Sequence, residues 1–150
     1  MTRTEAVNQI KYEHIRATVL HPAWPTNPVH QAAILCEETG ELIRAALRVT
    51  FEGADWSEVV TECVQSGAMA LRIVTELGYD AADFLLYASE MKPYSLADDV
   101  IEAAMRINEK AVFVTHDNIV PVFDQCAIVL AACIGFLEHV EDMKHARVAA

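Results

Sequence analysis

Apolar residues recur every three or four positions along most of the chain, and this spacing is the feature that most limits its fold. Such a spacing places apolar side chains on one face of an α-helix. No segment combines sustained apolar–polar alternation with turn dipeptides at its ends, which is the pattern typical of strands. We therefore predict an all-α helical bundle.

Breaks in this spacing predict about six helices in a single domain, residues 1–150. Three prolines within H-P-A-W-P-T-N-P end the first helix, and Asn27 followed by Pro28 is a typical start for the second. The expected helices span residues 4–20, 28–49, 57–77 and 81–91, then a fifth from a Ser95 cap to about 112, and 119–141. Four residues of the first helix are expected to be buried, namely Val7, Ile10, Ile15 and Val19.

Hydrophobic residues make up 53% of the 150 residues, and the mean hydropathy is +0.21. This is high for a soluble chain, so nearly every helix should bury a face, and we expect a homodimer or higher homo-oligomer. The longest apolar run, residues 126–137, is shorter than the roughly 20 residues of a membrane span. We expect it to be a core helix, with no membrane partner.

The formal net charge of −11 argues against nucleic acid as a partner, because it would repel a phosphate backbone. An anionic ligand would need a metal bridge. The sequence contains no C-x-x-C pair, and its cysteines lie in apolar helical segments, at Cys36, Cys63, Cys126 and Cys133. We expect no signal peptide. This pattern predicts buried thiols in a cytoplasmic protein.

Glutamates are concentrated in C-E-E-T-G-E, residues 36–41. On a helix, Glu37, Glu38 and Glu41 lie within one turn of each other on a common face. The next predicted helix repeats the pattern at intervals of four and three, in Glu58, Glu62 and Gln65. Two oxygen-rich faces are thus joined by a short connection.

A short connection favours an antiparallel hairpin, in which Glu38 and Glu41 can stand opposite Glu62 and Gln65. Three carboxylates and an amide oxygen would then converge between two helices. A hard cation, Mg²⁺ or Mn²⁺, would neutralise them, because these ions prefer oxygen ligands.

The residues also carry a family resemblance. The pattern E-E-x-x-E, followed after about twenty residues by E-x-x-D in an all-α chain, is typical of the MazG-like nucleoside triphosphate pyrophosphohydrolases, relatives of the dimeric dUTPases. Residues 28–77 resemble that family: residues 37–41 match the first half, and residues 62–65 match the second. One position departs, because Gln65 stands where the family usually has Asp.

The resemblance implies an enzyme that uses Mg²⁺ to cut a nucleoside triphosphate to a monophosphate and pyrophosphate, with a house-cleaning role in the nucleotide pool. It implies that Glu38, Glu41 and Glu62 ligate the metal and that Gln65 is a weak or water-mediated fourth ligand. Glu37 would orient or deprotonate the attacking water.

Basic side chains are expected to hold the phosphates. Arg44 and Arg48 follow Glu41 on the same helical stripe and can reach phosphates just outside a metal cluster. Arg106 and Lys110 lie one turn apart on the fifth predicted helix and could add positive charge if that helix closes over the site.

Other interpretations remain open. Gln65 suits a catalytically silent nucleotide-binding or regulatory relative. The acidic face, balanced by Arg44 and Arg48, would also suit a partner-binding bundle that meets a basic protein. A ferritin-like di-iron bundle is weaker, since only Asp142-x-x-His145 approaches its ligand motif. Trp24 and Trp56 would either cover the edge of the core or stack on a nucleobase.

The second half contains an echo of the first. D-D-V-I-E at residues 98–102 resembles residues 37–41, and a cysteine-bearing apolar helix follows each segment. A degenerate helical repeat over residues 95–141 is one interpretation, and acidic residues that complement a helix N-terminus are the other.

Overall fold

The computed structural model describes residues 1–91, 99–111 and 119–148, and these residues form six helices and no strand. The helices are α1 (Arg3–Leu20), α2 (Pro28–Phe51), α3 (Trp56–Glu76), α4 (Ala81–Glu90), α5 (Val100–Ala111) and α6 (Ile119–Val148). This confirms the predicted all-α fold. The expected cap at Ser95 lies outside the described residues.

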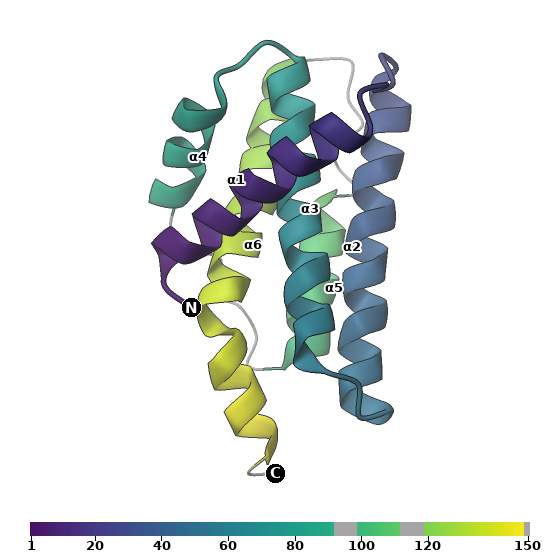
Figure 1. Ribbon diagram of the computed structural model, residues 1–150, viewed down its shortest axis with the longest axis vertical. Helices are drawn as coiled ribbons and strands as arrows, with labels where there is room; N and C mark the ends of the chain where they lie inside the picture. Colours follow the sequence, from purple (N-terminus) through teal and green to yellow (C-terminus); the bar gives the residue numbers. More distant parts are fainter. Residues whose placement is uncertain (92–98, 112–118, 149–150) are drawn as a thin grey trace.

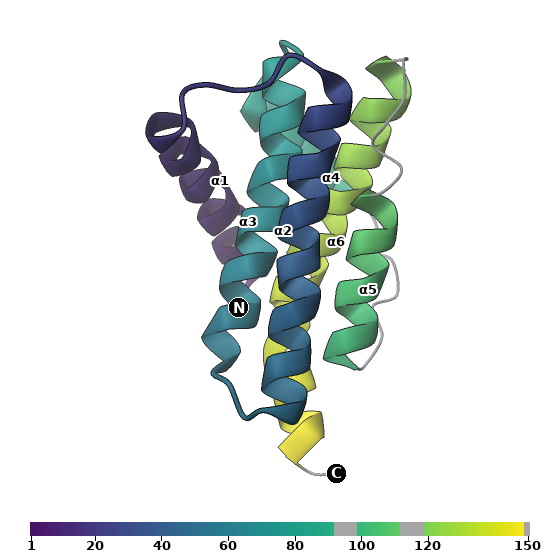
Figure 2. The same ribbon diagram turned by 90° about the vertical axis from the view of Figure 1, so that its right-hand side faces the viewer.

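Four helices form the body of the molecule. Around the bundle, α2 contacts α3, α3 contacts α6, α6 contacts α5, and α5 contacts α2. These helices run along the long axis, whereas α1 crosses the bundle obliquely over α3 and α6, and α4 lies beside α6 (Figure 1). Figure 2 shows α2 and α3 side by side, joined at their lower ends by a tight turn. The predicted antiparallel hairpin is therefore present.

The hairpin is fixed by local signals at its ends. Asn27 accepts a hydrogen bond from the backbone N–H of Val29 at 2.8 Å, and Pro28 occupies the first helical position, as predicted. In the turn between the helices, Gly53 adopts a φ of +72°, which a residue with a Cβ rarely adopts. Asp55 then caps α3. These signals set the register of α2 against α3.

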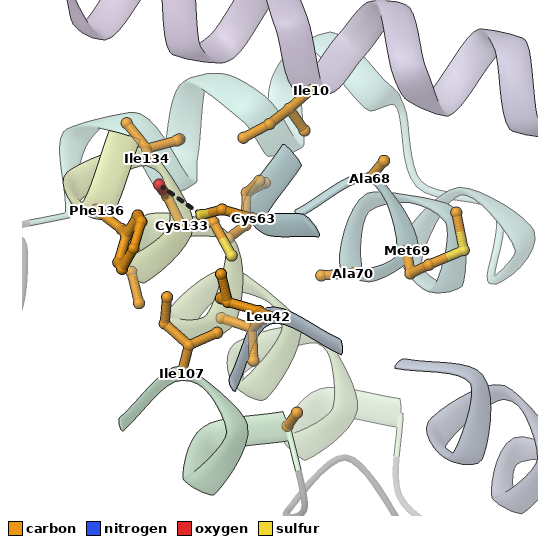
Figure 3. Packing of buried hydrophobic residues seen from close by; sticks show 14 of the residues in the cluster. Ile10, Leu42, Cys63, Ala68, Met69, Ala70, Ile107, Cys133, Ile134 and Phe136 are labelled. Atoms are coloured by element: carbon orange, nitrogen blue, oxygen red, sulfur yellow. Dashed lines mark hydrogen bonds between the residues drawn. The ribbon is translucent and has the colours of Figure 1, made fainter. Parts of the chain in front are cut away.

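The core fills the space between the four bundle helices. Leu42 of α2, Ile107 of α5 and Phe136 of α6 pack around Cys63 of α3 (Figure 3). The Cys63 thiol donates to the carbonyl oxygen of Cys133 at 3.5 Å. All four cysteines are free thiols, of which three are buried as predicted and Cys36 is partly exposed. Burial raises the pKa of the Cys126 thiol to about 12, so this group serves packing rather than chemistry.

The inward face of α1 differs from the prediction. Ile10 is buried and Val7 is partly buried, but the side chains of Ile15 and Val19 are 53% and 74% exposed. The other buried residues of α1 are small, namely Ala6 and Ala17. They let α1 approach α3 closely at Gly67, where an added Cβ would lie 2.9 Å from Cδ1 of Ile10. The prediction for Ile15 and Val19 was wrong. Helix α1 packs against α3 through its small residues, which allow the two helices to approach closely, and Ile15 and Val19 lie on the exposed side.

Helix α6 is longer than predicted, since it continues to Val148 rather than ending at 141. Within it, Val122–Ala146 is long and apolar enough to cross a membrane by length and composition alone. In this bundle 67% of its most apolar window is buried against the other helices. A core helix of a soluble bundle passes the same test, so the finding does not indicate a membrane on its own.

Candidate metal centre and the hollows beside it

Three glutamates meet on the hairpin. Glu38 and Glu41 come from α2 and Glu62 from α3, and one oxygen of each lies within 4.8 Å of the others. The three-residue step between Glu38 and Glu41 puts both on one face, and the antiparallel register brings Glu62 opposite them. The structure thus brings together the three carboxylates that the spacing predicted.

Glu38 sits in an unfavourable position for a negative charge. Its pKa is raised to about 7, chiefly because burial penalises the charged form and then because Glu41, Glu62, Glu37 and Glu13 repel it. Its Oε2 atom is buried without a hydrogen-bond partner. A cation at this point would satisfy that oxygen and remove the repulsion.

Glu62 is in a similar position. Its pKa is raised by burial first, then by the charge of Glu41 and a hydrogen bond to the Glu41 carboxyl, and then by Glu58. Its Oε2 atom is also buried without a partner. Within the described part of the chain, the cluster of Glu38, Glu41 and Glu62 has no salt bridge to a basic side chain. Its oxygen donors therefore fit a hard divalent ion such as Mg²⁺ or Mn²⁺.

A cleft opens on one side of the cluster, between α1, the segment that leads to α2, α2 itself and α3. Its volume is about 380 Å³, and Trp24, Ile34, Glu37, Glu38, Gln65 and Met69 are among its lining residues. We call it the Trp24 cleft. Apolar and aromatic groups form part of its wall, and charged side chains, among them Glu13, Arg16 and Arg72, form another part. Glu38 connects the cleft to the cluster.

A second, smaller hollow of about 260 Å³ lies on the other side of the cluster. It is lined by Glu41, Arg44, Ala45, Arg48, Glu58 and Glu62. We call it the Arg44 hollow. Arg48 pairs with Glu58 there at 2.5 Å and with Glu52 at 3.6 Å. Two carboxylates of the cluster therefore face a space that also presents two guanidinium groups.

The other predicted site residues are placed as follows. Gln65 and the exposed Glu37 line the Trp24 cleft together with Glu38. Arg106 pairs with Glu102 at 2.6 Å and Lys110 with Glu109 at 3.7 Å, and neither basic residue lines either hollow. Their helix, α5, contacts α2 and α6 but not α3, which carries Glu62. The structure therefore does not bring Arg106 and Lys110 to the cluster.

Acidic residues elsewhere have simpler roles. Asp99 caps α5, because its side chain accepts hydrogen bonds from the backbone N–H groups of Ile101 and Glu102. This agrees with the interpretation that acidic residues complement a helix N-terminus here. Asp98 lies outside the described residues. Asp142 and His145 are exposed near the end of α6 and do not join the cluster. The proposed repeat over residues 95–141 stays a prediction.

One important residue was missed by sequence reasoning. Arg72 is only 2% exposed, and its guanidinium carbon lies 4.2 Å from the centroid of the Trp24 ring. It donates to the carbonyl oxygens of His21 at 2.6 Å and Ala17 at 3.4 Å, at the C-terminal end of α1. The signal in the sequence is a lone arginine inside the apolar stretch G-A-M-A-L-R-I-V.

No protein family model, curated protein or solved structure matches the chain.

Proposed function

We propose that the protein is a nucleoside triphosphate pyrophosphohydrolase that uses Mg²⁺, or Mn²⁺, to cut the bond between the α- and β-phosphates. The observation that carries the proposal is the order of three features: the Trp24 cleft, the carboxylate cluster and the Arg44 hollow. A nucleoside triphosphate has a base and sugar, an α-phosphate, and two further phosphates in the same order.

In this proposal Glu38, Glu41 and Glu62 hold the divalent ion. Two of these carboxylates have a buried oxygen without a hydrogen-bond partner, which supports the assignment. When bound, the ion would neutralise phosphate charge and polarise a phosphoryl oxygen. A chain with a net charge of −11 needs such a counter-charge to hold a triphosphate.

The Arg44 hollow would receive the β- and γ-phosphates, which leave as pyrophosphate. Guanidinium groups suit this role because they bind phosphate oxygens through paired, charge-assisted hydrogen bonds. Arg48 is paired with Glu58 in the structure, so phosphate oxygens would replace that carboxylate as its partner.

Glu37 is proposed to orient or deprotonate the attacking water. It lies on the Trp24 side of Glu41, whereas Arg44 lies on the opposite side, one turn further along α2. Phosphoryl transfer needs the attacking and leaving oxygens roughly in line on opposite sides of the phosphorus. Water held at Glu37 and pyrophosphate held at Arg44 would satisfy that requirement.

The family resemblance adds a physiological role to this proposal. We propose that the protein acts in the cytoplasm as a homodimer or higher homo-oligomer and removes nonstandard nucleoside triphosphates from the nucleotide pool.

The test is a pyrophosphate assay on purified protein with a panel of nucleoside triphosphates and Mg²⁺ or Mn²⁺. We expect equal release of monophosphate and pyrophosphate, and a loss of about a hundredfold or more in rate for Glu38→Gln and Glu62→Gln. Glu109→Gln, which removes an exposed carboxylate on α5, is the matched control and should leave the rate unchanged. Release of single phosphates, or full activity in Glu38→Gln, would contradict the proposal.

Gln65 favours a second candidate, a catalytically silent nucleotide-binding relative, because the four expected ligand positions hold three carboxylates and one amide, where the family pattern has four carboxylates. This candidate predicts that a nucleotide with Mg²⁺ raises the melting temperature without any pyrophosphate release. Activity that appears only in Gln65→Asp would establish it.

A further inference from the structure

One part of the wall of the Trp24 cleft suits a flat organic ring, while charged side chains line another part. Ile34 of α2 and Met69 of α3 supply apolar surface, and Trp24 supplies an aromatic one. The volume of about 380 Å³ lies within the range of roughly 300–1,000 Å³ that small-molecule sites occupy. Bases stack on aromatic side chains in a largely sequence-tolerant way, because every base has a π-face.

Trp24 is held in place before any ligand arrives. The Arg72 guanidinium lies over its ring, and the same guanidinium is tied to the end of α1 through the carbonyl of His21. Arg72 is itself almost fully buried on α3. A ring that is already fixed loses little side-chain freedom on binding, which favours its use as a stacking surface.

Gln65 belongs to this cleft rather than to the Arg44 hollow. It lies one turn after Glu62 on α3, yet it lines the Trp24 cleft with Glu38, whereas Glu41 and Glu62 line the other hollow. An amide offers a donor and an acceptor side by side, which is the pattern that the edge of a nucleobase presents. A carboxylate is the better ligand for Mg²⁺.

We infer that the Trp24 cleft binds the nucleobase, stacked against Trp24, and that Gln65 hydrogen-bonds the polar edge of that base instead of ligating the metal. Gln65 is then a specificity-determining residue. The inference deepens the proposed function and rests on it, since it assigns the organic half of the same substrate.

The test uses nucleosides without phosphate, in the presence of EDTA, so that neither metal nor hydrolysis contributes. In Trp56→Phe, Trp24 is the remaining tryptophan of the two in the chain and reports directly on the cleft. We expect saturable quenching of its fluorescence by nucleosides with a preference among bases. In Trp24→Phe, where only Trp56 remains, the same nucleosides should cause none.

Variants at residue 65 separate base recognition from metal binding. Gln65→Leu should weaken the preferred nucleoside by about tenfold, as expected for the loss of hydrogen bonds in a cleft. Gln65→Glu, which keeps the shape but removes the donor, should change the order of preference among bases. Gln65→Leu should bind Mn²⁺, measured by electron paramagnetic resonance, as tightly as the parent, whereas Glu62→Gln should not.

Two outcomes would overturn the inference: Mn²⁺ affinity that falls in Gln65→Leu as it does in Glu62→Gln, or an absence of quenching by every nucleoside. If triphosphates are still hydrolysed in the second case, the proposed function stands and the base lies elsewhere. If nucleosides quench Trp24 but no triphosphate yields pyrophosphate, the cleft assignment stands and the proposed hydrolysis fails.

Discussion

The guanidinium carbon of Arg72 lies 4.2 Å from the centroid of the Trp24 ring, and the same side chain donates to the carbonyl oxygen of His21 at 2.6 Å. One residue of α3 thus fixes both the end of α1 and the segment that leads to α2. Trp24 and Arg72, held in this arrangement, form part of the wall of the Trp24 cleft.

Arg72→Lys should lower the free energy of unfolding by about 1–3 kcal/mol, because an ammonium cannot stack on Trp24 and donate to two separate carbonyls at once. Urea denaturation measures the change. Arg16→Lys is the matched control: Arg16 pairs with Glu13, one turn before it on the exposed side of α1, and its replacement should cost less than about 0.5 kcal/mol. Equal losses in the two variants would mean that the buried contacts of Arg72 contribute little.

Without divalent metal, stability should fall as the pH rises from about 5 to about 8. Glu38 has a pKa of about 7 in the folded protein against 4.5 for an ordinary glutamate, so in this window the folded state holds a proton that the unfolded chain releases. The free energy of unfolding therefore decreases with pH until the window is passed. The raised pKa of Glu62 acts in the same direction.

Glu38→Gln isolates this effect. Burial lowers the pKa of His14 below its ordinary 6.5, and that group makes the folded state more stable as the pH rises, which opposes Glu38. The variant removes only the glutamate and should gain on the order of 2 kcal/mol over the parent at about pH 8 in EDTA. A gain that is the same at about pH 5 would show that Glu38 does not titrate in this window.

Mg²⁺ or Mn²⁺ should raise the melting temperature, and more strongly at about pH 8 than at about pH 5.5. A protonated Glu38 is a poor ligand, so the ion competes with protons for the cluster. At a free ion concentration a hundred times the Kd, the stabilisation should be about 2.7 kcal/mol. Melting curves over an ion titration test this, with Glu62→Gln as the variant that should not respond. A response in Glu62→Gln equal to that of the parent would place the ion elsewhere.

The outer face of α1 should mediate association of the proposed oligomer with a second copy of the chain. Tyr12, Ile15 and Val19 are 71%, 53% and 74% exposed and lie along one stripe of the helix. The double change Ile15→Glu and Val19→Glu should reduce the mass in solution to the 16.6 kDa of a single chain, measured by light scattering. Met105→Glu, which adds a charge at a 57% exposed apolar residue of α5, is the control and should not. A parent protein that already has the mass of one chain would refute association.

Much of the fold followed from local signals. The Asn27–Pro28 start and the short connection after α2 were sufficient to predict the α2–α3 hairpin, and the hairpin was sufficient to bring Glu38 and Glu41 to Glu62. Helical spacing within one pair of neighbouring helices determines both features, and the sequence shows that spacing directly.

Features that depend on how separate helices pack were not predictable in this way. Apolar residues lie on both sides of α1, so spacing alone did not show that Ile10 would be buried and Ile15 exposed. The place of Gln65 and Arg72 in the Trp24 cleft depends on the path of residues 21–27 across α3, which no local pattern encodes.

All three carboxylates of the cluster come from consecutive helices, α2 and α3. The proposed ion site is thus contained in one contiguous stretch of about a third of the polypeptide, and among the residues that the structure describes α4, α5 and α6 contribute no carboxylate to it. Insertions or exchanges in the C-terminal half would leave the ligand set intact. The same hairpin could therefore be inherited as a unit in evolution while the helices around it diverge.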